Sequence, residues 1–478
     1  MKKEVEIFLP KNFEPEHHYY AKALNAQIHP MVGHFFHLHK QQIIQRYLHL
    51  NPRVQEKSLR EILDYKAKHF FWGGCDLFYV TTETGNRSMV VIETNSCPSG
   101  QKSMPPIDDW DEHRGYRLLI ENSFIPQMKS RRLIEGALAV IYDKNHMESS
   151  GYAATLADLT GEKVYLIPNS GGDEFCHFED GILYLKQPKK KKIAIRAAFR
   201  YVTQKPWDRI PVKTKTFIYN PTLVCLAGGR NKLLANKAYE IFNEEKKASG
   251  LQLHFPQTIR DVKKRDVPAW VKKWGGVAVI KNPYSNAGQG VYTITNEAEL
   301  EKFMQTEHEY DQFIVQSLIG HYLWSSMSGS GRFFHVGTIP NKKNKIYAAD
   351  LRMMVYATSE GFRPCALYAR RTRKPLEEKI PEGLTSWDVL GTNLSVKTGE
   401  GAWDSDTSRL LLMDRKDFNT LGIGTDDLVE AYIQTIQAII AIDKMAATLL
   451  NTKGEFKLSL FGELDNDPHL LQEILLEK

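Results

Sequence analysis

The sequence has few cysteines and no long hydrophobic run, and these two scarcities exclude several classes of protein. Its five cysteines lie at positions 75, 97, 176, 225 and 365 of 478 residues, without a C-x-x-C pair. We therefore expect neither a zinc ribbon nor a disulfide framework, and a reduced, cytoplasmic setting. No apolar run approaches the ~20 residues that cross a bilayer, and the stretch after Met1 is too short for a signal peptide. No membrane association is expected.

A strong excess of one charge is also missing. The formal net charge of +6 is a mild bias for a chain with 25% charged and 42% hydrophobic residues. Its densest basic cluster, at residues 189–192, is typical of a solvated loop. Nucleic-acid binding would require basic residues spread over one face and interleaved with aromatic residues, and this pattern is absent. The composition therefore predicts a globular protein with no nucleic-acid partner.

The spacing of apolar residues divides the chain into four segments. The first is helical up to about residue 70 and then changes to the period of two that is typical of strands. The second alternates strands with helix-like pieces, as in a small α/β domain. The third contains two glycine-rich loops, and the fourth combines basic strands with a long apolar helix that should lie in the core. The predicted domains are residues 1–125, 126–220, 221–330 and 331–478.

A predicted hairpin brings three oxygen-bearing side chains together. Two alternating apolar segments flank the turn TETGNR. If the hairpin is centred between Thr84 and Gly85, Asp76 lies opposite Glu93, and Asn95 shares the face of Glu93 because strand side chains alternate. Oxygen ligands of this kind suit Mg²⁺, which takes one or two carboxylates together with substrate phosphates. An edge hairpin whose polar residues merely face solvent is the alternative.

A second motif joins a lysine to a glycine-rich loop. In VAVIKNPYSNAGQG an apolar strand delivers Lys281, and the loop that follows contains Asn286, Gly288 and Gly290. Backbone N–H groups of such a loop can close around phosphate oxygens. It is not a Walker A loop, because the lysine precedes the glycines and no G-K-[ST] ending is present. A glycine-rich hairpin turn with a surface lysine is the alternative.

Two further stretches concentrate positive charge. LAGGRNKLL places Arg230 and Lys232 ahead of a helix, where backbone N–H groups favour anions. A later strand carries Asp350 and Arg352 on one face. Cationic side chains at this density attract polyphosphate or carboxylate, although any single arginine could form a surface salt bridge. The end of the next strand adds Arg370, Arg371 and Arg373.

Taken in chain order, these motifs resemble the ATP-grasp superfamily. Lys281 and its loop are followed by FIVQSLIG as an adenine-hinge strand, then by DLR, the basic strand and GTNLS around Asn393. The superfamily usually ends on G-x-D and E-x-N-x-x-P-G, whereas here that segment stands first, an order similar to that of eukaryotic-type glutathione synthetase. The resemblance implies an α/β (α+β) fold: a permuted ATP-grasp core with an inserted small α/β (Rossmann-like) substrate domain. It also implies ATP and Mg²⁺ as cofactors.

The resemblance also implies roles for individual residues. Glu93 and Asn95 would hold Mg²⁺, with support from Asp76. Two departures concern the site: Asn286 stands near the place of a metal-binding glutamate, and Gly74 replaces a substrate arginine. The implied nucleotide contacts are Lys232, Lys281, Asn286, Gly288, Gly290, Gln316, Ser317, Leu318, Ile319 and Asp350. The implied catalytic residues are Arg352, Arg371 and Arg373, and the implied substrate contacts are Arg200, Ser99 and Gly100.

The activity implied by the resemblance is that of an ATP-dependent carboxylate–amine ligase. It would form an amide bond through an acylphosphate, on an amino acid or a small peptide. Two alternatives stay open: an ATP-grasp kinase or polypeptide-modifying (glutamylating) enzyme, and a non-catalytic ATP-binding module, which the missing glutamate motivates. The expected partners are small-molecule carboxylate and amine substrates, and we allow for a homodimer.

Overall fold

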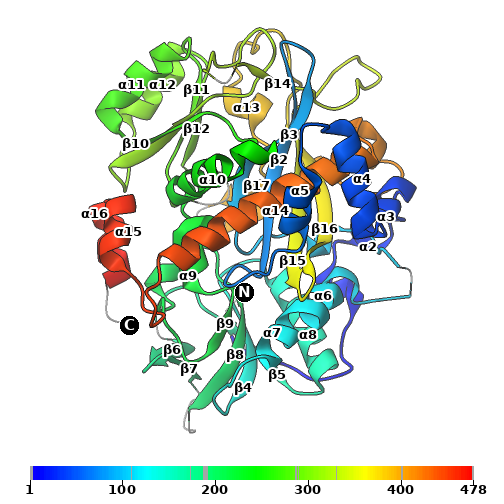
Figure 1. Cartoon of the computed structure of the whole chain (residues 1–478), viewed down its shortest axis with the longest axis vertical. Helices are drawn as coiled ribbons and strands as arrows, with labels where there is room; N and C mark the ends of the chain where they lie inside the picture. Colours follow the sequence, from blue (N-terminus) through cyan, green and yellow to red (C-terminus); the bar gives the residue numbers. More distant parts are fainter. Residues whose placement is uncertain are drawn as a thin grey trace.

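The structure is a computed structural model with three main sheets, each formed by a different combination of chain segments. It describes residues 4–108, 110–172, 174–186, 192–285, 288, 290–329, 331–399 and 402–475. Figure 1 shows a four-stranded sheet at the top, a six-stranded sheet in the middle and a seven-stranded sheet at the bottom. The α/β class predicted from the sequence is confirmed. Within the described ranges, no helix is both long and apolar enough to cross a membrane.

The seven-stranded sheet has a parallel centre. Strand β4 pairs in parallel with β5 and β8, and β8 with β9, as the alternation of strands and helices predicts. Helix α8 (His146–Thr160) packs on β4 and β5. Strand β1, which comes from the first predicted domain, pairs with β5 at the edge of this sheet. The domain limits expected from the sequence stay a prediction. The strands are β1 (Glu6–Phe8), β4 (Ala137–Tyr142), β5 (Val164–Pro168), β6 (Cys176–Glu179), β7 (Ile182–Leu185), β8 (Ile193–Tyr201) and β9 (Phe217–Tyr219).

The six-stranded sheet joins the front of the chain to its last third. The predicted hairpin forms β2 and β3, and Asp76 pairs with Glu93 as expected, with a bulge after Asp76 that shifts the register by one residue. Strand β15 pairs with the other edge of β2 and brings Arg352 opposite Asp76. The strands are β2 (Trp72–Thr82), β3 (Arg87–Asn95), β14 (Phe333–His335), β15 (Ala349–Thr358), β16 (Gly361–Arg371) and β19 (Leu410–Leu411).

The four-stranded sheet carries its own small core. Its order is β10-β13-β11-β12, and the apolar faces of α11 and α12 cover it through residues such as Val271 and Phe303. Lys281 is the last residue of β11 and Gln316 the last of β13. The elements are β10 (Thr258–Lys263), α11 (Val267–Lys273), β11 (Ala278–Lys281), β12 (Val291–Ile294), α12 (Glu297–Gln305) and β13 (Gln312–Gln316). A separate hairpin consists of β17 (Ser395–Gly399) and β18 (Ala402–Ser405).

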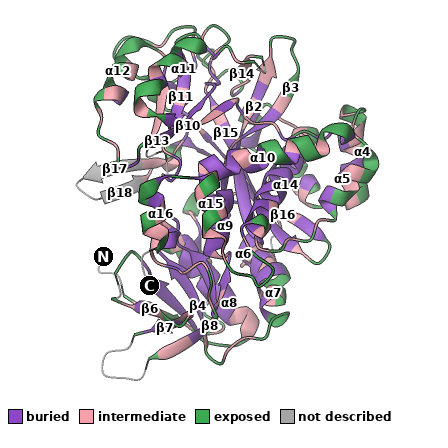
Figure 2. Ribbon diagram, turned by 60° about the vertical axis from the view of Figure 1, so that its left-hand side comes forward, coloured by how far each residue is buried: buried purple, intermediate pink, exposed green. Residues whose placement is uncertain are grey.

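Helices pack against the six-stranded sheet, α14 (Thr425–Thr448) against β2, β3 and β15 and α6 (Arg114–Leu119) against β16. The long helix α14 crosses the middle of the molecule and is buried along most of its length, so the prediction that it belongs to the core is confirmed (Figure 2). Three N-terminal helices pack beside it: α3 (Pro30–Phe36), α4 (Lys40–Leu50) and α5 (Glu56–Leu63). Helix α1 (Pro15–His18) packs on α8, and α2 (Ala21–Leu24) lies next to Gln101–Ser103. The others are α7 (Ile125–Lys129), α9 (Thr222–Val224), α10 (Lys232–Lys246), α13 (Ser386–Leu390), α15 (Leu458–Leu464) and α16 (Pro468–Leu475).

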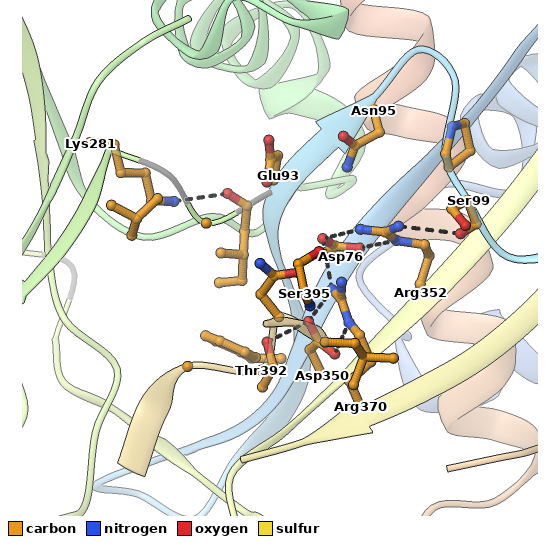
Figure 3. Close-up of a pocket in the computed structure, with 18 of the residues that line it drawn as sticks. Asp76, Glu93, Asn95, Ser99, Lys281, Asp350, Arg352, Arg370, Thr392 and Ser395 are labelled. Atoms are coloured by element: carbon orange, nitrogen blue, oxygen red, sulfur yellow. Dashed lines mark hydrogen bonds and ion pairs between the residues drawn. The ribbon is translucent and has the colours of Figure 1, made fainter. Parts of the chain in front are cut away.

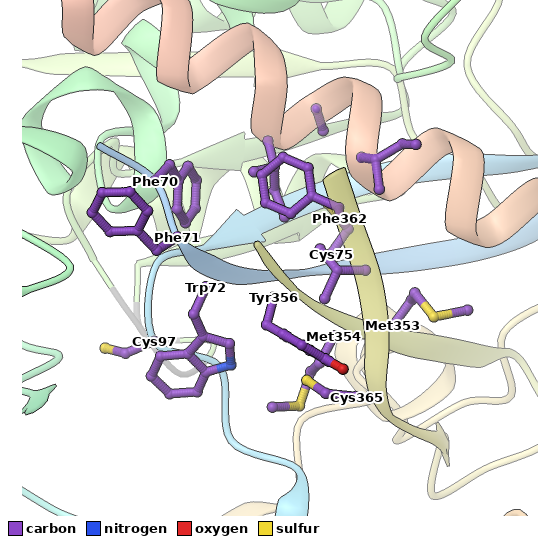
Figure 4. Packing of buried hydrophobic residues seen from close by; sticks show 14 of the residues in the cluster. Phe70, Phe71, Trp72, Cys75, Cys97, Met353, Met354, Tyr356, Phe362 and Cys365 are labelled. Atoms are coloured by element: carbon purple, nitrogen blue, oxygen red, sulfur yellow. The ribbon is translucent and has the colours of Figure 1, made fainter. Parts of the chain in front are cut away.

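One buried carboxylate on α14 fixes the entry into β2. Asp443 is fully buried and accepts hydrogen bonds from the backbone N–H groups of Lys68, His69 and Phe70 at 2.7–2.9 Å, and from the Tyr65 hydroxyl at 2.8 Å. The aromatic side chains at this entry, Phe70, Phe71 and Trp72, belong to one buried core, in which Trp72 points away from α14 toward Tyr152 and Phe199 (Figure 4). Asp443 therefore sets where the sheet that carries Asp76 begins.

Replacing Asp443 by alanine should destabilise the fold strongly. The change leaves one buried and three partly buried donors without their acceptor, so we expect the free energy of unfolding to fall by about 3 kcal/mol. The matched control is Asp426→Ala on the same helix, because Asp426 is half exposed and pairs with the partly exposed Arg46, so its loss should be below about 1 kcal/mol. Thermal and urea unfolding of both variants measure the difference, and equal losses would contradict this role for Asp443.

Candidate functional site

A cavity of about 480 Å³ lies where the three sheets approach one another. Its walls come from the ends of β2 and β3, from β15 and β16, from β11 and β13, and from the loops after β4 and β8. Figure 3 shows side chains from these separate segments pointing toward one another. A second, smaller pocket of about 20 Å³ adjoins it and shares Glu93, Lys232 and Lys281.

The lining of the cavity is strongly cationic. It contains seven lysines and arginines against three carboxylates. Since burial removes the water that screens like charges, such an excess favours an anionic ligand. The cations are Lys102, Lys144, Arg230, Lys232, Lys281, Arg352 and Arg370, and the carboxylates are Asp76, Glu93 and Asp350.

Two of the three carboxylates are bound to arginines. Arg352 holds both oxygens of Asp76, with Nε–Oδ1 and Nη2–Oδ2 distances of 2.5 and 2.7 Å. Arg370 Nη2 lies 2.9 Å from Asp76 Oδ2, and Arg370 Nε donates to Asp350 Oδ1 at 2.9 Å. Burial alone would raise the pKa of Asp76, but the two guanidinium groups outweigh it and hold that pKa well below its usual range. Asp350 has a raised pKa because of burial.

This arrangement corrects the expected role of Asp76. Both of its oxygens are occupied by guanidinium groups, so the carboxylate is not placed as a metal ligand. Asp350 likewise contacts Arg370 and the Thr392 hydroxyl rather than an open space, although it does line the cavity. The sequence placed both acids at the site, but the pairing of β2 with β15 decides what they hold.

The expected catalytic arginines are also corrected. Arg370 and Arg371 are neighbours on β16, so their side chains point to opposite faces of the sheet. Arg370 enters the cavity, whereas the Arg371 guanidinium lies 4.8 Å from the centre of the Tyr347 ring, outside the lining. Arg373 is exposed beyond the end of the strand. Arg352, by contrast, lines the cavity as predicted.

Arg200 is not placed to bind substrate. It is fully buried and lies outside the cavity lining, and its guanidinium donates to the carbonyl oxygens of Asn220, Val202 and Ser96 at 2.7, 2.6 and 3.2 Å. The prediction of a substrate contact is therefore wrong for this residue. Arg200 instead ties the loop after β3 to the end of β8.

Two lysines and one glutamate form the part of the lining next to the four-stranded sheet. Lys281 Nζ donates to the Ile92 carbonyl at 3.2 Å, and Lys232 Nζ lies 3.4 Å from Glu93 Oε1. Burial lowers the pKa of Lys281 to about 8, against the opposing effect of Glu93, and it also lowers the pKa of Lys232. Both lysines are thus cations that a nearby anion would stabilise.

The strand end after β13 supplies a less polar wall. Gln316, Ser317, Leu318 and Ile319 all line the cavity, as predicted, and the aliphatic side chains of Val279 and Ile92 lie in the same lining. The neighbouring glycine-rich loop contributes Gly288, while Gly290 lies outside the lining. Both glycines have positive φ angles, of 75° and 66°. Asn286 lies outside the described residues.

Of the three expected metal ligands, Glu93 and Asn95 remain, because arginines hold Asp76. Glu93 is the one lining carboxylate that no arginine holds among the described residues, and its side chain is 26% exposed. Asn95 Oδ1 accepts from Arg230 Nη1 at 3.1 Å, while its buried Nδ2 has no partner in the described part of the chain. No cluster of three or more histidine, cysteine or acidic residues capable of holding a metal occurs there either. The donor set fits Mg²⁺ only if phosphate oxygens and water complete the shell.

A buried glutamate that sequence reasoning missed shapes the loop after β3. Glu148, in the first turn of α8, accepts from the Ser99 hydroxyl at 2.7 Å and from the N–H groups of Gly100 and Gln101 at 2.9 and 3.0 Å. Ser99 lines the cavity as predicted, but Gly100 does not, because it packs against Met354. No spacing in the sequence links Glu148 to this loop; only the docking of α8 does.

The C-terminal segment is a second feature that the sequence did not reveal. Asp465, just after α15, accepts from Asn231 Nδ2 at 2.6 Å and from the Tyr284 hydroxyl at 2.7 Å. Asn231 also caps α10, so it immediately precedes Lys232, while Tyr284 lies three residues after Lys281. One buried acid thus braces the segments that carry both lysines.

Comparison with known proteins gives similarities of structure only. No protein-family model and no curated protein matches the sequence. Similar solved structures include a glutathione synthetase-like effector from Globodera pallida, with 12% identity and a TM-score of 0.35 over 72% of this chain and 82% of that chain. A RimK domain ATP-grasp protein from Sphaerobacter thermophilus has 11% identity and a TM-score of 0.29 over 48% and 90%. D-alanyl-alanine synthetase A from Vibrio cholerae has 10% identity and a TM-score of 0.29 over 49% and 88%.

At such low TM-scores these likenesses carry no argument, and the function has to be argued from the site itself.

Arg370 and Arg371 offer a matched pair for testing the geometry. Arg370→Met leaves two buried carboxylates short of a partner, so we expect the free energy of unfolding to fall by about 3–5 kcal/mol at pH 7. Arg371→Met removes a ring contact on the other face and a long hydrogen bond to the Thr372 carbonyl, and it should cost less than about 1 kcal/mol. Urea unfolding of both variants tests which of the two arginines on β16 faces the cavity. A larger fall in the free energy of unfolding for Arg371→Met than for Arg370→Met would contradict this assignment.

Proposed function

We propose that this chain is an ATP-dependent carboxylate–amine ligase that forms an amide bond through an acylphosphate. The observation that carries the proposal is the convergence of Lys281, Lys232 and Glu93, from three different segments, in one cationic cavity with a less polar wall beside them. Purely structural lysines would pair with acids, whereas these two share a single carboxylate.

The nucleotide would occupy the part of the cavity next to the four-stranded sheet. An adenine ring suits the wall of Leu318, Ile319 and Val279, because this wall is largely aliphatic. The phosphates would then lie near the ammonium groups of Lys281 and Lys232, which lose little solvation on binding because they are already buried. The same cations would neutralise the charge that develops during phosphoryl transfer.

Glu93 and Asn95 would hold Mg²⁺ together with phosphate oxygens. Bound there, the ion would offset the negative charge of the polyphosphate. Asn95 would have to release Arg230 or turn its amide to offer its oxygen, since Oδ1 now accepts from that guanidinium. Glu93 needs no such change, because no guanidinium among the described residues holds its carboxylate; it pairs with Lys232 Nζ, which also donates to the Ser285 carbonyl.

The proposed reaction has two displacement steps. A substrate carboxylate oxygen attacks the γ-phosphorus of ATP, and the bond to the ADP oxygen breaks. The amine nitrogen then attacks the acyl carbon, a C–N bond forms, phosphate leaves and the nitrogen loses a proton to solvent. Arg352 and Arg370, in place of Arg371 and Arg373, are the cations available to the carboxylate and the transferring group. Their bonds to Asp76 and Asp350 keep them in fixed positions.

Lys281→Ala should weaken ATP binding without affecting the fold. Because it removes a buried cation next to the phosphates, we expect the Kd for ATP to rise roughly thirtyfold or more, or ~2 kcal/mol. Calorimetric titration with Mg-ATP, without other substrates, measures the effect. The control variant is Lys272→Ala. Lys272 is exposed on α11, the helix that covers the same four-stranded sheet, and its loss should leave the Kd unchanged. An unchanged titration for Lys281→Ala would remove the basis of the proposal.

Glu93→Gln should raise the requirement for Mg²⁺. Loss of the carboxylate charge should increase the Mg²⁺ concentration for half-maximal turnover by roughly tenfold or more. The assay is ADP release with amino acids and dipeptides as carboxylate and amine. Glu83→Gln, at the exposed tip of the same hairpin, is the control and should behave like the wild type.

The products of the same assay decide the reaction class. A ligase releases free phosphate in equal amount to ADP, and only when an amine is present. Phosphate retained on an acceptor would identify a kinase instead, and ATP binding without any turnover would identify a non-catalytic module.

A further inference from the structure

The end of the cavity next to the seven-stranded sheet contains two lysines that the proposed reaction leaves unused. Lys144 follows β4 and Lys102 lies in the loop after β3, and both line the cavity. Lys102 is buried; its Nζ donates to Asn145 Oδ1 and lies 4.7 Å from the centre of the Tyr20 ring. Strand β4 belongs to the bottom sheet of Figure 1, whereas Lys281 belongs to the top one. The two lysines therefore lie toward the end opposite the proposed nucleotide.

Lys144 carries a charge without a counter-charge in direct contact. Its Nζ has no hydrogen bond or ion pair with any residue that the structure describes, although the side chain is half-buried. Burial lowers the pKa of Lys144, and the positive charge of Arg230 lowers it further. An ammonium group in this setting is stabilised by an anion in the cavity.

The carboxylates closest to the two lysines are already engaged elsewhere. Asp143 accepts from the N–H groups of Thr203 and Gln204 at 2.8 and 2.7 Å. Glu148 holds the loop after β3, and it also accepts from Asn145 Nδ2 at 3.0 Å. Within the described part of the chain, no acid forms an ion pair with either lysine. The missing negative charge has to come from a ligand.

The surrounding groups fit a small polar anion. Helix α8 begins at His146, two residues after Lys144, and its amino end adds a partial positive charge to that of the two lysines. Tyr20, Tyr201 and Thr203 complete this end of the lining. The Tyr201 hydroxyl accepts from Asn145 Nδ2 at 2.8 Å and donates to Glu148 Oε2 at 3.5 Å, and the Thr203 hydroxyl donates to Asp143 Oδ1 at 3.1 Å. The charge of the two lysines is therefore the main attraction for an anion at this end.

We propose that the carboxylate substrate carries a second anionic group, and that Lys144 and Lys102 bind it at this end of the cavity. The identity of the ligand as a substrate rests on the proposed function, whereas the anion site itself does not require ATP. A carboxylate and a phosphate share the chemistry that this site recognises. The two lysines would then select substrates with charge at both ends over those with a single carboxylate.

The test is an anion titration of the full-length protein without nucleotide. Glutarate, butyrate and inorganic phosphate serve as a dicarboxylate, a monocarboxylate and a phosphate probe, with binding followed by thermal shift and calorimetry. We expect glutarate or phosphate to bind more tightly than butyrate, and Lys144→Met and Lys102→Met each to raise that Kd by roughly tenfold. Lys163→Met, an exposed lysine before β5, is the control and should bind like the wild type.

Two results would overturn the proposal. One is equal binding of glutarate and butyrate, or no binding of any probe, by the wild-type protein. The other is unchanged binding by both lysine variants, with their stability shown intact by thermal unfolding. The ATP titration and ADP-release assay on the same variants are read separately. A failure of ligase activity is thereby distinguishable from a failure of the anion site.

Discussion

The site depends on one buried interaction, the ion cluster in which Asp76 and Asp350 alternate with Arg352 and Arg370. Each of these four side chains would be costly to bury alone, and each is bound by at least one opposite charge. The cluster joins β2, β15 and β16 in a single register, because a slip of one residue would turn every member to the other face of the sheet. It thereby links the front of the chain to its last third and holds Glu93 across from Asp76.

A consequence of this pairing is that the remaining charges are unbalanced. Two of the three lining carboxylates are bound to arginines, and Glu93 pairs with Lys232. Among the residues that the structure describes, no acid forms an ion pair with Lys102 or Lys144. The protein thus keeps cations in a partly dry cavity that water cannot fully screen. Buried, unbalanced positive charge raises the free energy of the folded protein when no ligand is bound, and the binding of an anion lowers it again. This is the physical link between the fold and the proposed ligase activity.

Several features of the site could be predicted from sequence because they follow from short-range rules. Strand alternation and the Gly-Asn turn placed Asp76 opposite Glu93, and the structure confirms that pair. The same rules predicted that Lys281 ends a strand. The roles of Arg371 and Arg373 came instead from the family resemblance, which does not tell adjacent arginines on a strand apart; which of them faces the cavity depends on the neighbouring strand. The role of Arg200 came from the same resemblance, whereas its partners include backbone carbonyl groups from three separate segments.

The sequence by itself determined the α/β class, the hairpin and the residue types that gather at the cavity. These depend on periodicity and turn chemistry, which act over a few residues. Which lysines and arginines form ion pairs with acids, and which do not, depends on pairings between segments far apart in the chain. This could be learned only from the tertiary structure. It likewise decided that Glu148 shapes the loop at Ser99 and that Asp465 braces the base of both lysines, because packing alone brings these acids to their partners.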